Sequence, residues 1–211
     1  TTRYLYAGAG IGYGASGSNV SNVHNYGELY IGEEATCLSL IAGGLMAYQS
    51  GDTGEDGRIA DSTNNAPVNV FCKTATENPN KTGLYFRVGG IAGWNQINVN
   101  NCKNLEKGKV TVKTSIFNND ASTYNVCIGG LVGYKTVWYN NNCSNNADLD
   151  LDFTVTTNDT WTAYDQICLC VGGLFGWKGD RVGNNCVNNG NISIGCTSSG
   201  RLILGGISGR A

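Results

Sequence analysis

The stretch Ile128-Gly129-Gly130-Leu131-Val132-Gly133-Tyr134 decides the fold, because the chain repeats its pattern. The pattern is an apolar residue, two glycines, an apolar residue, a variable residue, a glycine and an aromatic residue. Clear copies begin at Val88 and Val171, weaker copies at Ala7 and Ala42, and a truncated copy runs from Leu204 to Arg210. A phrase that returns every 33–46 residues is typical of stacked repeats, in which each unit buries its apolar face against its neighbours.

The composition excludes two classes of partner. The 211 residues carry a formal net charge of −2, and only 14 % of them are charged, which is too little positive charge to bind nucleic acid through its phosphates. No apolar run approaches the roughly 20 residues that a membrane-spanning helix needs. Glycine and asparagine are abundant. Both residues tolerate left-handed backbone, so the sequence predicts many tight turns.

Each repeat contains three short stretches of strand-forming residues. In the fifth repeat these are 168–171, 174–177 and 191–194, separated by a Gly-Gly pair and by an Asn-rich segment. Runs of β-forming residues between glycine and asparagine clusters are typical of strands, and no helical periodicity interrupts them. The sequence therefore predicts an all-β fold, a parallel β-solenoid with about one three-stranded coil per repeat.

We expect residues 1–211 to form a single array with neighbouring coils about 4.8 Å apart. The expected repeats are 4–36, 37–83, 84–123, 124–166, 167–200 and a partial repeat, 201–211. The two ends of the sequence fall near the same phase of the repeat, and no initiator methionine is present. Two interpretations stay open: a segment of a longer array, or a subunit that stacks end to end.

Equivalent positions agree across the repeats, as direct stacking requires. We expect two inward apolar rows on the first strand, through Leu40 and Ala42, and two on the third strand, through Leu29 and Ile31. One turn position holds an asparagine in every repeat, and we expect these side chains to form a hydrogen-bonded amide ladder. Its members are Asn25, Asn64, Asn104, Asn145 and Asn188.

Aromatic residues follow the third glycine of the pattern, and Arg210 takes that place in the last copy. This aromatic row consists of Tyr13, Tyr48, Trp94, Tyr134 and Trp177. Rings on an outer face could bind the flat apolar faces of sugars, whereas rings at a corner of the coil would contribute stacking of about 0.5–1.5 kcal/mol per pair. Recurrence on every coil favours the structural interpretation.

Another row alternates with the inward residues of the first strand and therefore faces outwards. This outer row consists of Ile41, Arg87, Cys127, Cys170 and Ile203. Because four of the five are apolar, we expect the row to be covered by the long segments between repeats, by a neighbouring chain or by a partner. The four apolar members are therefore candidate interface residues.

Nine cysteines leave at least one outside any disulfide within the chain. Three of them share one repeat position: Cys102, Cys143 and Cys186. Val23 and Ser62 fill that position in earlier repeats, which argues against a metal site and favours a thiol ladder or one disulfide between adjacent coils. Cys127 and Cys170 form a second candidate pair. No metal or cofactor site is expected.

The run 148–152 places three aspartates on one face of a strand. Carboxylates so spaced could bind calcium or take part in glycoside hydrolysis. The preceding coil offers Lys109 and Lys113 at the matching positions. Ion pairs from Lys109 to Asp148 and from Lys113 to Asp152 are therefore the simpler expectation.

The copies at Ile128 and Val171 are followed by Asn-Cys-x-Asn-x-(Gly or Ala)-x-apolar, and the copy at Val88 is followed by Asn-Cys-x-Asn with two additional residues before Gly108. In this combination the chain resembles the GLUG repeat of microbial surface and secreted proteins, best over 129–151 and 172–194 and closely over 89–112. The resemblance covers most of the chain and implies an adhesin-like repeat that brings no catalytic residues. Four glycosylation sequences agree with an extracellular location, beginning at Asn19, Asn80, Asn158 and Asn191.

These observations lead to two functional hypotheses. The first is a non-enzymatic extracellular module, structural or adhesive, which could be a filament subunit that assembles end to end through open sheet edges. Its partners would be copies of itself, head to tail or laterally, or neighbouring domains of a longer array. An incomplete last coil at 205–207 would then be completed by residues 2–5 of a following copy. The second is a glycan-binding or polysaccharide-active β-helix, which requires exposed tryptophans and at least two nearby carboxylates. Its candidate tryptophans are Trp94, Trp138, Trp161 and Trp177.

Overall fold

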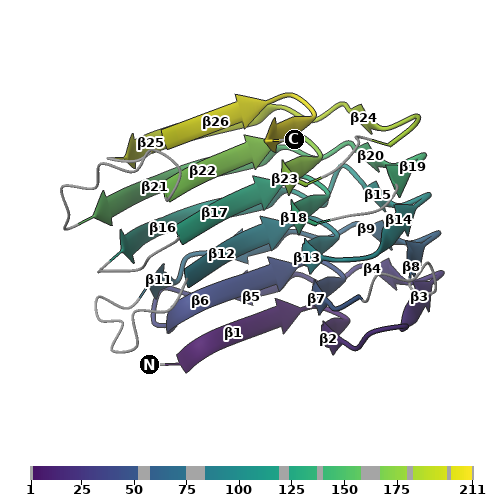
Figure 1. The fold of residues 1–211 in the computed structure, drawn as a ribbon, viewed down its shortest axis with the longest axis horizontal. Coiled ribbons are helices and arrows are strands. Elements are labelled where there is room, and N and C mark those ends of the chain that lie inside the picture. Colours follow the sequence, from purple (N-terminus) through teal and green to yellow (C-terminus); the bar gives the residue numbers. More distant parts are fainter. Residues whose placement is uncertain are drawn as a thin grey trace.

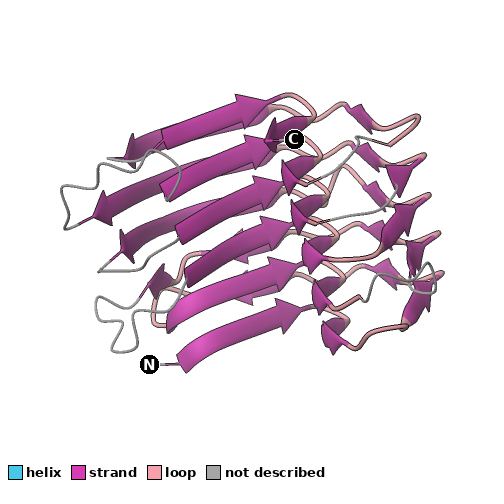
Figure 2. Cartoon of the chain, in the orientation of Figure 1, coloured by secondary structure: helices cyan, strands magenta, loops and turns pink. Residues whose placement is uncertain are grey.

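The computed structural model describes residues 2–51, 58–74, 84–118, 124–136, 140–157, 167–179, 183–198 and 201–210. The described residues form strands, turns and loops (Figures 1 and 2), and among them no helix could cross a membrane. Strands of successive coils pair in parallel. The expected all-β solenoid is therefore confirmed.

Five parallel sheets, named A to E in their order along a coil, run the length of the solenoid. Sheet A contains β1 (Thr2–Gly8), β6 (Thr36–Gly43), β12 (Leu84–Gly89), β17 (Tyr124–Gly129), β22 (Ile167–Gly172) and β26 (Arg201–Gly205), and β11 (Lys73–Thr74) also pairs with β6. Sheet B contains β2 (Ile11–Gly14), β7 (Met46–Gln49), β13 (Ala92–Asn95), β18 (Val132–Lys135), β23 (Phe175–Lys178) and β27 (Ser208–Arg210). These are the first and second strands expected in each repeat.

The third expected strand forms sheet E, and two further sheets lie before it. Sheet C contains β3 (Asn19–Ser21), β8 (Arg58–Ala60), β14 (Asn98–Asn100) and β19 (Asn140–Asn141). Sheet D contains β4 (His24–Asn25), β9 (Thr63–Asn64), β15 (Lys103–Asn104), β20 (Ser144–Asn145) and β24 (Val187–Asn188). Sheet E contains β5 (Leu29–Ile31), β10 (Val68–Val70), β16 (Val110–Asn118), β21 (Leu149–Thr157) and β25 (Ile192–Ser198). Stacked turns hydrogen-bond between coils, so sheets C and D arise where the sequence indicates only turns.

The register of the sheets confirms the predicted apolar rows. Phe86 lies between Leu40 and Val126 in sheet A, and Val110 lies between Val68 and Leu149 in sheet E. Sheets A and E face each other across one buried apolar core, and a second core lies under sheets B and C. Figure 1 shows that the strands of these two facing sheets run in opposite directions.

The predicted amide ladder is also confirmed. Nδ2 of Asn25, Asn64, Asn104 and Asn145 donates to Oδ1 of the asparagine on the next coil at 2.8–2.9 Å. Each Nδ2 donates in addition to a backbone carbonyl of its own turn, such as Ala66 O or Gly108 O. The side chains of Asn64, Asn104 and Asn145 are fully buried, so the ladder satisfies polar groups inside the solenoid.

Candidate functional site

The aromatic row lies along sheet B, one ring per coil. Successive ring centroids are separated by 5.1 Å (Tyr13–Tyr48), 4.7 Å (Tyr48–Trp94), 5.7 Å (Trp94–Tyr134) and 5.3 Å (Tyr134–Trp177). The rings are tilted or edge-on rather than flat against one another. Tyr13 is exposed, and the other four are half-buried. The row is thus both a stacked ladder and a surface.

The outer row of sheet A lies beside the aromatic row and packs against it. Tyr134 and Trp177 contact the buried pair Cys127 and Cys170, and Ile203 packs against the same cluster. Cys127 and Cys170 have no exposed surface and Ile41 is only 1 % exposed. The row is covered, as expected, so these three side chains are not available to a neighbouring chain or a partner. Tyr134 and Trp177 of the same chain cover Cys127 and Cys170, whereas the sequence indicated the long segments between repeats as one source of this cover. Ile203, on the last coil, remains partly exposed.

Arg87 is the one charged member of the outer row and is only 2 % exposed. Its Cζ lies 3.7 Å from the ring centroids of Trp94 and Tyr134 and 4.3 Å from that of Tyr85. Burial lowers the pKa of Arg87 to about 10 and raises the pKa of Tyr134 above its usual value. The guanidinium therefore stays charged at neutral pH and is held by three aromatic rings.

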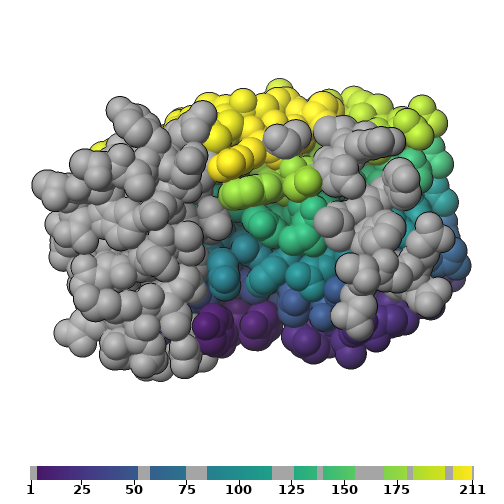
Figure 3. Space-filling model, viewed as in Figure 1, coloured from purple at the N-terminus to yellow at the C-terminus, as the bar shows by residue number. Residues whose placement is uncertain are grey.

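Some hydrogen-bond donors around Arg87 have no acceptor among the described residues. These are Nε and Nη1 of Arg87 and Nε1 of Trp94, all of them buried. A second guanidinium, that of Arg210, lies 4.3 Å from the ring centroid of Trp177 at the end of the row. In Figure 3 the described residues of successive coils, from purple to yellow, form one continuous strip over sheets A and B.

The C-terminal face of the solenoid is a second candidate site. Leu202 is 40 % and Leu204 55 % exposed, although both occupy inward positions on β26. Val171, Ile192, Ile194, Leu204 and two glycines line a cavity of about 410 Å³ there. Residues 2–5 pair with β6 in sheet A. In a copy stacked head to tail they would therefore lie on β26 rather than complete the last coil.

The described cysteines are free thiols, and Cys102, Cys143 and Cys186 stack on adjacent coils as the thiol-ladder alternative predicts. Each sulfur lies 3.3–3.6 Å from two backbone carbonyl oxygens. Burial raises the pKa of Cys102 to about 11. A hydrogen bond from Cys143 lowers the pKa of the half-buried Cys186 to about 6, and the same bond raises the pKa of Cys143.

The aspartate run on sheet E serves the scaffold. Lys109 Nζ pairs with Asp150 Oδ2 at 2.9 Å, and this hydrogen bond lowers the pKa of Asp150. The expected partner, Asp148, instead accepts hydrogen bonds from the backbone and side chain of Asn191 on the next coil. No Lys113–Asp152 ion pair is found among the described residues. The prediction of Lys109–Asp148 pairing is therefore wrong.

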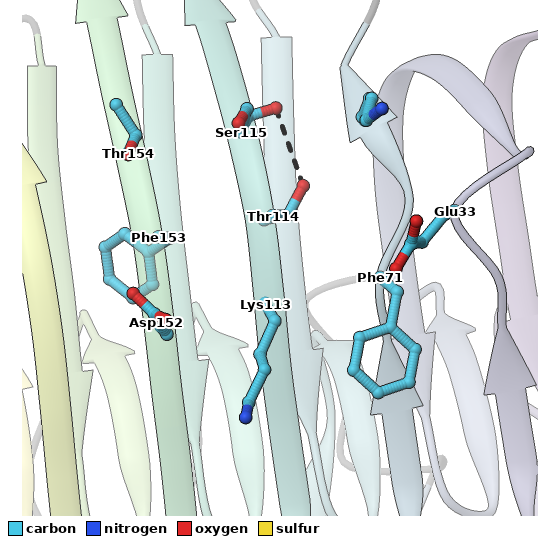
Figure 4. Close-up of a pocket in the computed structure, with 9 residues that line it drawn as sticks. Glu33, Phe71, Lys113, Thr114, Ser115, Asp152, Phe153 and Thr154 are labelled. Atoms are coloured by element: carbon cyan, nitrogen blue, oxygen red, sulfur yellow. Dashed lines mark hydrogen bonds between the residues drawn. The ribbon is translucent and has the colours of Figure 1, made fainter.

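A shallow cavity of about 420 Å³ lies on the outer face of sheet E. Figure 4 shows Lys113 and Asp152 among its lining residues, on the neighbouring strands β16 and β21, and Phe71, which directly follows β10. Glu33 and Lys73 also line it. Opposite charges alternate around this cavity rather than two carboxylates facing each other. Its composition is therefore that of a solvated strand surface.

The structure describes two of the four predicted glycosylation positions and two of the four candidate tryptophans. Asn19 and Asn191 are exposed, as acceptors of glycans must be. Trp94 and Trp177 are half-buried, so the requirement of the glycan hypothesis for exposed tryptophan is met in part. The remaining predicted positions, Asn80, Asn158, Trp138 and Trp161, lie outside the described residues.

A buried polar row lies under sheet B and was not predicted from the sequence. Its members follow the aromatic row by one position and are Gln49, Asn95, Lys135 and Lys178. All four are fully buried. Lys135 donates to the carbonyl of Ile97, and Gln49 donates to that of Ala15 at 3.0 Å. The constant spacing from the third glycine is a signal that could have revealed them.

Comparisons with known proteins identify no relative from which a role for these sites could be inferred. No family model, curated protein or solved structure matches the chain. Among the described residues, groups without a partner include the donors around Arg87, buried side-chain atoms of Gln49, Asn95, Thr136 and Asn140, and the apolar C-terminal face.

Proposed function

We propose that the chain is a non-enzymatic structural and adhesive module of the cell exterior, built to stack coils and to pair with a second copy of itself. The observation that supports it best is the apolar C-terminal face. Leu202 and Leu204 are inward core residues that meet solvent, beside a cavity of about 410 Å³. Exposed apolar patches of this kind mark association sites, and an unpaired sheet edge adds main-chain donors and acceptors.

The shape of this face suggests how two copies would meet. Sheet A ends with β26, one strand beyond β22, whereas sheet E ends with β25, which belongs to the same coil as β22. A second copy stacked head to tail would place β1 on β26 and leave one strand position of sheet E empty.

A two-fold rotation axis parallel to the strands would instead relate the two copies so that β26 of each copy fills the empty position of sheet E in the other. Because sheets A and E run in opposite directions (Figure 1), this rotation lays β26 of each copy antiparallel against β25 of the other. Leu202 and Leu204 of one copy would then cover Ile192 and Ile194 of the other. Self-complementary two-fold interfaces are the commonest arrangement in oligomers.

Further support for the external location comes from the surface and the repeat pattern. Asn19 and Asn191, which begin two of the glycosylation sequences, are exposed. The resemblance to GLUG repeats points to surface and secreted proteins. The same face would accept a further coil of a longer chain, so the experiment must ask what the 211-residue protein itself does.

Sedimentation velocity over a concentration series tests the pairing. We expect the 211-residue protein to form a dimer and Leu204→Lys to remain monomeric with an unchanged circular dichroism spectrum. Tyr30→Lys is the matched control, because Tyr30 is an exposed aromatic of sheet E at the opposite end and should leave the dimer intact. A monomer at every concentration, or a dimer unaffected by Leu204→Lys, would contradict the proposal.

Glycan binding is a second candidate, favoured by the aromatic row. One ring per coil gives a regular platform of five rings, four of them half-buried and one exposed. Such rings present apolar faces while their polar edges stay near water. This candidate concerns a different surface from the C-terminal face and is compatible with pairing.

A further inference from the structure

Two cysteines of the thiol ladder, Cys143 and Cys186, lie directly opposite each other on adjacent coils. The residues that follow them are in register, because Ser144 pairs with Val187 in sheet D and Val187 N donates to Cys143 O at 2.9 Å. The residue before each cysteine has the same left-handed backbone conformation on both coils. Paired strands are about 4.8 Å apart, which falls within the range of Cα separations that a disulfide spans. The backbone therefore already holds the two residues at the separation of a disulfide.

The two side chains point the same way and contact each other. Cys143 Sγ lies 3.3 Å from Val99 O and Cys186 Sγ lies 3.6 Å from Asn140 O, and these two carbonyl residues are themselves paired in sheet C. A hydrogen bond joins the two thiols, with Cys143 as the donor. Among the described residues, the side chain of Cys143 bonds in this way to Cys186 and not to Cys102. The contact therefore selects one pair from the ladder of three.

The two thiols differ in access and in charge. Cys143 is 1 % exposed, whereas Cys186 is half-buried and precedes β24, the last strand of sheet D. The hydrogen bond from Cys143, with the charge of Lys178, lowers the pKa of Cys186 to about 6. At neutral pH the accessible sulfur is therefore the thiolate, which is the form that attacks disulfides.

We propose that Cys186 is a modification site for small disulfides such as oxidised glutathione, and that Cys143 resolves the adduct into a disulfide between the fourth and fifth coils. The Cys186 thiolate attacks one sulfur of the small disulfide, and the other half leaves as a thiolate. Cys143 then attacks the Cys186 sulfur, and the second half leaves with the Cys143 proton as a thiol. The two cysteines are oxidised, and the small disulfide is reduced to one thiol and one thiolate.

The reaction goes beyond the proposed function and does not rest on it. It requires the two thiols and the small disulfide, and no group from a second copy. The external location proposed above would supply an oxidant of this class, because disulfides form and persist in oxidising environments outside the cell.

A second pair of cysteines provides an internal comparison. Cys37 and Cys72 also share a hydrogen bond between their side chains, but neither has any exposed surface. If access to the oxidant decides the reaction, this pair should stay reduced in the folded protein. Its response therefore separates the effect of contact from the effect of access.

Mass spectrometry after incubation with oxidised glutathione at neutral pH tests the proposal, with free thiols alkylated and the protein digested without reduction. We expect a peptide linked through Cys143 and Cys186 that dithiothreitol separates again. Cys143→Ser should stop at Cys186 carrying one glutathione, and Cys186→Ser should give neither product. Cys102→Ser is the matched control and should link as the wild type does. Ser62 fills the same position on an earlier coil, so serine is compatible with the fold.

The reaction is followed in the Leu204→Lys variant as well, because Cys186 lies on the coil beside the C-terminal face. Pairing of two copies cannot hide the thiol in that variant. Absence of the linked peptide from both proteins overturns the proposal, and so does a link from Cys143 to Cys102 instead. A linked peptide in a protein that sediments as a monomer supports the site and contradicts only the pairing of copies.

Three further outcomes would overturn parts of the assignment. A disulfide between Cys37 and Cys72 that forms at the same rate would show that opening of the fold, not an accessible thiolate, admits the oxidant. A glutathione adduct that persists on wild-type Cys186 would exclude Cys143 as the resolving thiol. A covalent dimer through Cys186 on a non-reducing gel would assign the thiol to an interface between copies instead.

Discussion

The second glycine of each repeat is fixed by its contacts with the next coil. A Cβ at Gly90 would approach the carbonyl oxygen of Gly130 and the amide of Asn104 to within 3.0 Å, and the same holds one coil further on. The equivalent residue of the last coil, Gly206, has nothing within 4 Å of such a Cβ. The motif therefore depends on glycine for close approach between coils.

Replacing this glycine with alanine should lower the stability of the protein on an inner coil and hardly change it on the last coil. Gly130→Ala forces the new Cβ against Gly173 O and Asn145 Nδ2, and we expect it to lower the free energy of unfolding by about 1–3 kcal/mol. Gly206→Ala should change it by less than about 0.5 kcal/mol. Urea denaturation followed by tryptophan fluorescence measures both. Similar losses for the two variants would show that chain flexibility, not contact, explains the glycine.

At the scale of the element, the amide ladder links the five complete coils through hydrogen bonds that are buried in the middle of the ladder and partly buried at its ends. Asn104→Ala leaves one N–H of Asn64 Nδ2 without its acceptor, and Oδ1 of Asn145 keeps only the longer bond from Ala147 N at 3.3 Å. A buried donor left without an acceptor costs about 1–3 kcal/mol. We therefore expect the unfolding midpoint in urea to fall markedly, whereas Asn189→Ala, which breaks an exposed bond of 2.9 Å to Asn146, should leave it almost unchanged. A small effect of Asn104→Ala would mean that water replaces the ladder.

The thiol ladder predicts an unusual pH dependence for one cysteine. The Cys143 thiol donates to Cys186 and the Lys178 charge lies nearby, so the pKa of Cys186 falls to about 6, below the ordinary value of about 8.5. Because the thiolate is the reactive form, alkylation of Cys186 by iodoacetamide should rise through pH 6 and level off by pH 8. Mass spectrometry of the labelled peptide measures the rate. In Cys143→Ala the midpoint should move up towards the ordinary value; an unmoved midpoint would refute this cause.

The elements were predictable where side-chain identity repeats with the coil. Stacked positions such as Leu40, Phe86 and Val126 follow from the alternation of the first strand, and the register agrees. The cover of Cys127 by Tyr134 and Trp177 was not predictable, because periodicity gives the face of a strand and not the direction in which a neighbouring ring leans. The pairing of Lys109 with Asp150 has the same origin: a long side chain reaches a diagonal neighbour.

At the scale of the whole molecule, the sequence predicts the array and its repeats but not the sites that lack partners. The charge of Arg87 is visible in the outer row, yet its burial and its orphaned donors depend on three rings from two coils. Sheet A extends one strand beyond sheet E at the C-terminal face, and this difference becomes apparent only when the strands of each sheet are assigned in the structure. Both candidate sites therefore emerge only when the coils are stacked.

Direct stacking also separates the length of the chain from the length of the molecule. The repeats span 33–46 residues, yet each adds one strand to sheet A, and so about 4.8 Å to the axis. Residues inserted between the end of sheet E on one coil and the start of sheet A on the next do not alter this spacing. The number of coils between two surface groups therefore sets their distance along the axis. This distance stays constant when the segments between repeats lengthen or diverge in sequence.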